Sequence, residues 1–170
     1  MTAIRTGSLA AALFCAISFA APLSAAEWTE LSEGRQVSDK VIVGAQPTKE
    51  VLQQAADAGI KVVVNMRGAD EDPGYDEPAA AAELGLTYLH LPIAGAAGLT
   101  PENVHLFDAL LKQVGDQPVL MHCASSNRVG AMHALHASQY GGMDPEAAIE
   151  YGKAHGMTSL EEAVRERLEP

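Results

Sequence analysis

The most constraining feature of the sequence is a run from Ile60 to Met66 (IKVVVNM) that is rich in β-branched residues and almost continuously apolar. A strand of this kind is covered on both faces, as in a parallel sheet between helix layers. Similar runs alternate with helical patterns along the chain, and this order predicts right-handed crossovers. The predicted strands are 41–43, 60–66, 86–91 and 118–122, and the predicted helices are 48–58, a short Ala-rich helix ending at 84, 100–114, 128–140, 145–155 and 159–168. We therefore expect an α/β fold with a mostly parallel four- to five-stranded sheet flanked by helices.

Residues at the ends of the helical patterns are typical of helix caps. Thr48 is expected to cap the first helix and Gly59 to follow its end. Ser159 and Glu162 have the spacing of a capping box, which predicts that the last helix begins at Ser159.

Residues 1–26 resemble a secretory signal peptide. One basic residue, Arg5, precedes an apolar run over 9–21, and Ala26 ends a small-residue stretch that favours cleavage before Glu27. A run of this length is too short to span a membrane as a helix. We therefore expect a secreted protein, periplasmic if the source is a Gram-negative bacterium, without stable membrane insertion after cleavage, and with 27–170 as a single domain.

The charge and cysteine content narrow the function. The chain has 22 acidic and 11 basic side chains and a formal charge of −11, which argues against nucleic acid as a partner. Of two cysteines, Cys15 lies in the predicted signal peptide, so the mature chain would keep only Cys123 and no internal disulfide. A lone thiol in an oxidising compartment is either buried and inert or used for its chemistry.

The segment from His122 to Arg128 (HCASSNR) joins a predicted buried strand to a helix. At such a junction, backbone N–H groups and the helix N-terminus favour negative charge, which would lower the pKa of the Cys123 thiol and hold an oxyanion. Arg128 could bind two oxygens of that anion. The expected anion-binding residues of the loop are Ala124, Ser125, Ser126 and Asn127. The alternative is a cysteine that simply packs at the end of a strand.

At this point the chain resembles a known family, the phosphatase-like domain of the beta-lactamase-hydrolase-like proteins, within the dual-specificity and tyrosine phosphatase superfamily. The resemblance covers about 36–140 and is carried by the segments 44–47 (GAQP), 65–67 (NMR), 88–92 (YLHLP), 100–102 (TPE) and 122–128. It implies a sheet flanked by helices, with Cys123 as a nucleophile that forms a thiophosphate intermediate. It also implies that Arg128 binds phosphoryl oxygens and that the backbone of 124–128 forms the cradle.

Three features depart from tyrosine phosphatases. Cys123 and Arg128 are separated by four residues instead of five, a spacing that also resembles the six-residue loop of rhodanese-type sulfurtransferases. Val129 stands where phosphatases commonly have Ser or Thr. The segment 92–98 (PIAGAAG), where dual-specificity enzymes place a general-acid Asp, contains no acid.

The best replacement for that acid is Glu71 or Asp72, in the loop after the strand 60–66. Loops that follow parallel strands emerge at the same edge of the sheet, so these side chains could reach the cysteine loop and protonate a leaving alcohol. A solvated acidic turn is the alternative. Arg67 opens the same loop and could supply a second anion contact or bridge to those acids.

The histidines do not indicate a metal site or a further catalytic group. His133 and His136 have a spacing that can share a metal, but no third ligand accompanies them, so we expect no metal and no cofactor. His122 is expected to point away from Cys123 and to serve as a hydrogen-bonded scaffold residue more than as a base.

Three functions follow. The first is an exported, cysteine-dependent phosphatase-like hydrolase of phosphomonoesters that acts through Cys123. The second is sulfur transfer through a persulfide on Cys123, and the third is a weakly active anion-binding module. The expected partner is a small phosphorylated or sulfur-containing substrate, or a phosphoprotein.

Overall fold

Five strands form one sheet in the order β1-β2-β5-β3-β4 in the computed structural model, which describes residues 34–169. β2, β5, β3 and β4 are parallel, and only β1 runs antiparallel, along the outer edge of β2. The strands are β1 (Gly34–Gln36), β2 (Val41–Gly44), β3 (Val62–Asn65), β4 (Thr87–His90) and β5 (Val119–His122). The predicted α/β class and mostly parallel sheet are confirmed. β1 was not predicted, because three residues without an apolar pattern carry no strand signal.

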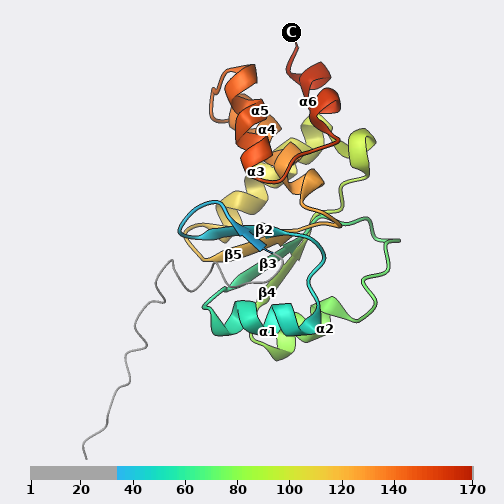
Figure 1. Cartoon of the computed structure of the whole chain (residues 1–170), viewed down its shortest axis with the longest axis vertical. Coiled ribbons are helices and arrows are strands. Elements are labelled where there is room, and N and C mark those ends of the chain that lie inside the picture. The colour runs from blue at the N-terminus through green and yellow to red at the C-terminus, as the bar shows by residue number, and fades with distance from the viewer. Residues whose placement is uncertain (1–33, 170) are drawn as a thin grey trace, which may run out of the picture.

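Helices cover both faces of this sheet (Figure 1). α1 (Lys49–Asp57) and α2 (Glu77–Glu83) lie on one face, and the other helices lie on the opposite side. Those are α3 (Pro101–Val114), α4 (Asn127–Gln139), α5 (Pro145–Ala154) and α6 (Glu161–Leu168), with a short 3-10 helix, η2 (Gly95–Gly98). Because β2, β5 and β3 are parallel, their carboxyl ends lie at the same edge of the sheet, where the loops to the helices begin.

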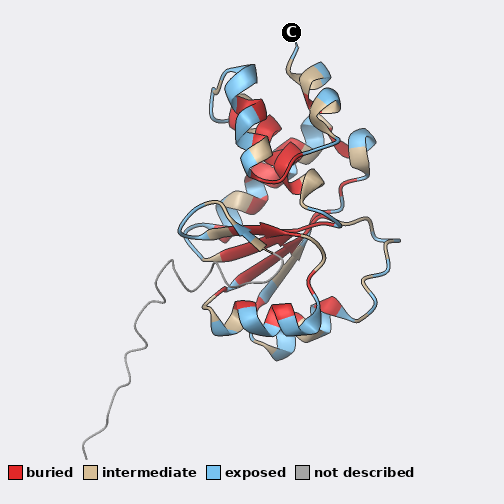
Figure 2. Cartoon of the chain, in the orientation of Figure 1, coloured by how far each residue is buried: buried red, intermediate tan, exposed pale blue. Residues whose placement is uncertain are grey.

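The inner strands β2, β5 and β3 are buried on both faces, and they are the red strands between the helix layers in Figure 2. Side chains alternate along each strand, so Val63 and Leu120 pack in the α1–α2 core, whereas Val64 and Met121 pack in the α3–α4 core. This two-sided burial is what the β-branched run in the sequence predicts.

Two glycines allow α4 and α5 to pack closely. A Cβ atom on Gly130 would overlap the backbone of Met157 and Gly152, and one on Gly152 would lie 2.7 Å from the Cβ of Ala134. The close approach brings the segment after α5 against the start of α4. The cysteine loop, which leads into α4, thus has the C-terminal part of the chain as a neighbour.

The predicted caps have mixed outcomes. Thr48 caps α1 by accepting from the amide of Val51, and Gly59 follows the helix with a positive φ of 90°. The predicted capping box at Ser159 is wrong: α6 begins at Glu161, and the Ser159 hydroxyl accepts a hydrogen bond from Asn127 instead. A tertiary partner has replaced the local cap.

The predicted signal peptide, including Cys15, lies outside the described residues. Within residues 34–169, no helix combines the length and apolar character needed to cross a membrane.

Candidate functional site

Cys123 follows directly after β5, the central strand of the sheet. It is 1% exposed and belongs to the core cluster on the α3–α4 side. Because it stands at the carboxyl end of β5, its thiol lies at the base of the loop that leads to α4.

The loop turns sharply between strand and helix. Ala124 and Ser125 are exposed, and Ser125 forms an isolated bridge with Ala45 at the end of β2. Ser126 has a left-handed backbone (φ 63°), the only described residue other than glycine with a positive φ, and it stands at the N-cap position of α4. A non-glycine residue in this region costs of order 1 kcal/mol or more and is maintained only where the surroundings fix it.

Asn127 fixes the loop from the C-terminal side. Its Oδ1 accepts hydrogen bonds from the amides of Thr158 (2.8 Å) and Leu160 (3.3 Å), and its Nδ2 donates to Ser159 Oγ (2.7 Å). Asn127 therefore joins the cysteine loop to backbone groups that are more than thirty residues away in the sequence.

Gly156 lies against the same loop. Its φ is 97°, and a Cβ atom at this position would overlap the side chain of Ser126. The left-handed Ser126 is thus held between the sheet and the turn after α5.

Arg128, in the first turn of α4, forms a two-pronged ion pair with Glu71. Its Nη1 donates to Oε1 and its Nη2 donates to Oε2 at 2.8 Å, and Nη1 also donates to the carbonyl of Ile93 at 3.2 Å. The pKa of Arg128 is raised, chiefly by the hydrogen bonds to Glu71 and further by the nearby Cys123 side chain. Arg128 therefore connects the cysteine loop with the loops that follow β3 and β4.

Glu71 is shared between two arginines. Its Oε2 also accepts from Arg67 Nε at 3.3 Å, and its Oε1 accepts from the amide of Gly68 at 2.6 Å. These bonds, first of all those from Arg128, lower the pKa of Glu71 to about 2. The loop after β3 thus contacts Arg128, the last residue of the cysteine loop, through Glu71. The ionised carboxylate carries no proton near neutral pH, however, and this disfavours Glu71 as the proton donor.

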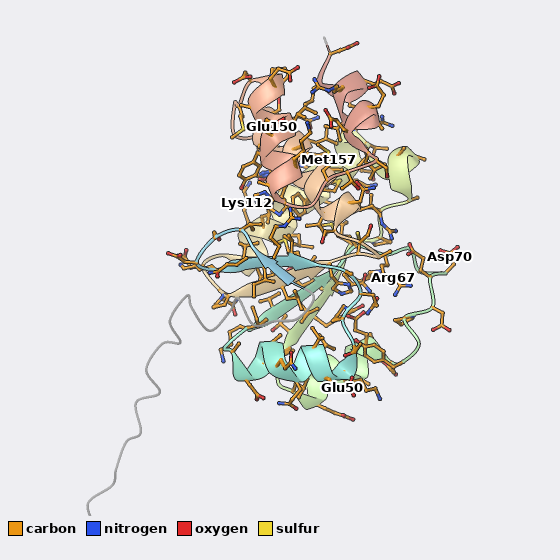
Figure 3. The ribbon with its side chains drawn as sticks, viewed as in Figure 1. Glu50, Arg67, Asp70, Lys112, Glu150 and Met157 are labelled. Carbon is orange, nitrogen blue, oxygen red and sulfur yellow. The ribbon has the colours of Figure 1, made fainter. Side chains whose placement is uncertain are left out.

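Asp72 has a different setting. It is exposed, and its carboxylate accepts from the amide of Gly74 at 2.7 Å, whereas its carbonyl accepts from Arg67 Nη2 at 2.9 Å. Figure 3 shows Arg67 beside the sheet and Asp70 farther out along the same loop. Arg67 also donates to Gln46 Oε1, which lies after β2.

The acid-free segment 92–98 contains η2 and lies against the site through Ile93. Arg167 of α6 holds it, because its Nη2 donates to the carbonyl of Ala96 at 2.7 Å and its Nε donates to that of Leu99. The sequence did not indicate this role of Arg167, since nothing in its local pattern points to a partner so far away.

A buried polar cluster supports the loop from the other face of the sheet. His122 Nε2 lies 2.9 Å from Glu77 Oε1, and both side chains are completely buried. Glu77 Oε2 accepts from Asn65 Nδ2 (3.0 Å) and Tyr88 Oη (3.4 Å), and Asn65 Oδ1 accepts from the amide of Arg67. The expectation that His122 points away from Cys123 agrees with this placement. The buried role of Glu77 was not predicted, because its position in the sequence is that of an ordinary acidic residue in the first turn of a helix.

An open pocket of about 480 Å³ borders the exposed side of the loop. Its lining includes three residues with hydroxyl groups, Ser125, Ser126 and Thr158. Arg35 of β1 also lines it.

The histidines form an aromatic cluster. The rings of His133 and His155 lie 4.2 Å apart, and Phe107 packs edge-on against His133 at 5.0 Å. Burial lowers the pKa of His133 well below its usual value, and the neighbouring histidines add to the effect. Over the described part of the chain, no three His, Cys, Asp or Glu side chains are placed to hold a metal ion.

The comparisons with known proteins agree with this geometry. A family model described as "DSP-PTPase phosphatase fused to NAD+ Kinase" matches residues 16–166. The "Beta-lactamase hydrolase-like protein" of Xylella fastidiosa is 28% identical over 124 residues, which are 71% of this chain. The chain spans only 28% of the length of that relative.

Solved structures of similar fold come from several organisms. A candidate phosphatase of Neisseria meningitidis (nma1982) has a TM-score of 0.64 and 25% identity, and the match covers 79% of this chain and 94% of that one. A DUF442 protein of Shewanella putrefaciens has a TM-score of 0.62 and 19% identity, with 85% and 96% covered. PTPMT1 (TM-score 0.56, 20% identity, 78% and 92% covered) and TpbA of P. aeruginosa (0.53, 19%, 82% and 92%) share the fold as well.

Proposed function

Because the chain belongs to the family of DSP-PTPase phosphatases described as fused to NAD+ kinase, we propose that it is a cysteine-dependent phosphatase acting on phosphomonoesters. The observation that carries the proposal is the position of Cys123 at the end of the central strand, below a loop closed by Arg128. This arrangement supports a role for Cys123 as the nucleophile and for Arg128 as the side chain that binds phosphoryl oxygens.

The proposed reaction has two steps. The Cys123 thiolate attacks the phosphorus atom, a P–S bond forms, and the P–O bond to the substrate alcohol breaks. Water then attacks the thiophosphate, which releases inorganic phosphate and restores the thiolate. Backbone N–H groups of 124–128 and the side chain of Arg128 would stabilise the charge on the phosphoryl oxygens in both steps. The loop residues concerned are Ala124, Ser125, Ser126 and Asn127.

The leaving alkoxide needs a proton, and Asp72 is the better of the two predicted donors. Glu71 is ionised and bound to Arg128, whereas Asp72 is exposed and its carboxylate bonds locally to Gly74. Asp72→Asn is expected to reduce the rate with an alkyl phosphate by about 10²–10⁴-fold. An unchanged rate would remove Asp72 from this role.

The substrate class follows from two neighbours of the same fold. PTPMT1 has been solved in complex with PI(5)P, and TpbA with pTyr. We therefore expect a phosphorylated substrate, and the open pocket beside Ser125 and Ser126 offers space for its remainder.

Sulfur transfer is the second candidate, favoured by the absence of an acid in 92–98 and by the engagement of Glu71 with Arg128. In that reaction the Cys123 thiolate would attack the sulfane sulfur of thiosulfate, sulfite would leave, and cyanide would take the sulfur as thiocyanate. No proton donor is required.

One pair of assays separates these functions. The full chain is incubated under reducing conditions with an aryl phosphate and, separately, with thiosulfate and cyanide. We expect phosphate release that is lost in Cys123→Ser and strongly reduced in Arg128→Lys, because lysine lacks the two-pronged donor. Thiocyanate formation without phosphate release would favour sulfur transfer. Phosphate binding by Cys123→Ser, with no turnover of either substrate by the unmodified chain, would indicate an anion-binding module.

Export is part of the proposal. The features of residues 1–26 support cleavage after Ala26, and periplasmic location if the source is Gram-negative. The mass of the protein isolated from cells that express the full chain is expected to be that of 27–170, and recovery of the unprocessed mass would count against export.

A further inference from the structure

The carboxylate of Glu71 occupies a position between two guanidinium groups. Its Oε2 accepts from Arg128 Nη2 at 2.8 Å and from Arg67 Nε at 3.3 Å, so both cations contact one oxygen atom. Its Oε1 takes the remaining terminal nitrogen of Arg128. Both terminal nitrogens of the arginine in the cysteine loop are thus engaged by a side chain of the protein itself.

The burial of the three side chains places the carboxylate outermost. The side chains of Arg67 and Arg128 are 11% and 13% exposed, whereas that of Glu71 is 30% exposed. Glu71 belongs to the loop between β3 and α2, in which Ala69, Asp70 and Asp72 are exposed. The Glu71 side chain can therefore turn toward solvent without opening either core.

Among residues 34–169, Arg67 and Arg128 form no ion pair with any Asp or Glu other than Glu71. The remaining bonds of Arg67 go to Gln46 Oε1 and the carbonyl of Asp72, and Arg128 bonds to the carbonyl of Ile93. One carboxylate therefore balances two largely buried cations. Once Glu71 leaves, both guanidinium groups would need another anion, because unpaired buried charge is costly.

A carboxylate and a phosphoryl group bind arginine through the same two-oxygen geometry. We propose that Arg67 and Arg128 form one anion subsite for a phosphate-sized dianion, and that Glu71 is a displaceable internal ligand of it. This inference rests on the proposed function, since the dianion would be the phosphoryl group that Cys123 attacks. Because the pKa of Glu71 is about 2, its carboxylate competes in its charged form throughout the neutral range.

The opposite role makes the opposite prediction. If Glu71 only supports Arg128 in its binding position, then neutralising it would weaken anion binding. If Glu71 competes with the anion, neutralising it would strengthen anion binding.

The test measures the affinity of the full chain for inorganic phosphate by titration calorimetry, in a Cys123→Ser background without turnover. Glu71→Gln keeps the shape and removes the charge, and it is expected to tighten phosphate binding by about fivefold. Glu71→Asp, which keeps the charge on a shorter side chain, is expected to give a smaller gain. The matched control is Glu162→Gln, which removes the same charge from an exposed site on α6.

Adding Arg67→Gln to Glu71→Gln is expected to cancel the gain, because the subsite then has a single guanidinium group. Weaker or unchanged binding in Glu71→Gln relative to the Glu162→Gln control would overturn the inference and leave the proposed function intact. Loss of phosphate binding in every variant, including the Cys123→Ser parent, would remove both. Thermal unfolding of each variant verifies that it is folded.

Discussion

The imidazole Nε2 of His122 lies 2.9 Å from Oε1 of Glu77, and neither side chain has any exposed surface. The pair joins β5 to α2 on the face of the sheet opposite Cys123. Through Asn65, which donates to Glu77 and accepts from the amide of Arg67, the same cluster reaches the loop that carries Glu71. The floor of the candidate site therefore contains polar side chains although it is fully buried.

Removing Glu77 is expected to destabilise the whole domain. Glu77→Ala would leave Asn65 and Tyr88 without the buried carboxylate that accepts hydrogen bonds from both, and the loss of such an acceptor costs about 1–3 kcal/mol. The free energy of unfolding in urea measures the effect. Glu83→Ala, at an exposed position of the same helix, is the control, and an equal loss in both variants would mean that the cluster adds nothing.

A methyl group at Gly156 is expected to distort the cysteine loop. Gly156→Ala combines the strain of a positive φ with overlap against Ser126, whereas Gly142→Ala has a similar φ of 67° and no atom within 4 Å. Both should lose about 1 kcal/mol from backbone strain. Only Gly156→Ala should also weaken phosphate binding, as measured by calorimetry in the Cys123→Ser background. Equal phosphate affinity in the two variants would show that the loop does not depend on this contact.

Asn127 offers a graded test of the tie between the loop and the C-terminal segment. Asn127→Asp keeps the oxygen that accepts from Thr158 and Leu160, and it replaces only the amide group that donates to Ser159. Asn127→Leu loses all three and should cost about 1–3 kcal/mol of stability, since two backbone amides lose their acceptor. Thermal unfolding should therefore rank the Asp variant between the unmodified chain and the Leu variant. The reverse order would contradict the assigned bonds.

Acid stability should depend on His133. Burial lowers the pKa of this side chain well below 6.5, so the unfolded chain binds the proton more readily as the pH falls. The stabilising contribution is complete above the unfolded pKa of about 6.5 and is lost progressively below it. Around His133 lie His155 and Tyr151 of the α5 region, Phe107 of α3, and His136, which pairs with Asp108. His155 also has a lowered pKa and acts in the same direction.

The measurement is the free energy of unfolding at about pH 8 and about pH 5. His133→Leu is expected to lose less stability between these values than the unmodified chain. His105→Leu, which removes an exposed histidine of α3, should behave as the unmodified chain does. An unchanged acid sensitivity in His133→Leu would assign the effect to other groups.

Much of the fold follows from local pattern. The β-branched run in β3 and the Gly and Pro residues at helix ends predict the parallel sheet and the position of Cys123, because these signals are contained in a few adjacent residues. The edge strand β1 escaped prediction because its three residues pair with β2 without an apolar face.

The polar partners of the site are less predictable. The loop with Glu71 was expected near the cysteine loop, but its pairing with Arg128 arises from two segments 57 residues apart. Ser159 is a second example. Its spacing to Glu162 predicts a capping box, but its hydroxyl accepts a hydrogen bond from Asn127 instead. Side chains with several possible partners are assigned by the tertiary structure, and short-range spacing does not identify which partner they choose.

The contacts of Ser126 and Asn127 with the turn after α5 have an evolutionary consequence. A larger side chain at 156, or a changed one at 127, can be accepted only together with a compensating change on the other side. Positions 126–127 and 156–160 should therefore covary among relatives as one unit, and a chimera that exchanges the cysteine loop without the turn should fold poorly. The two segments would be inherited as a pair.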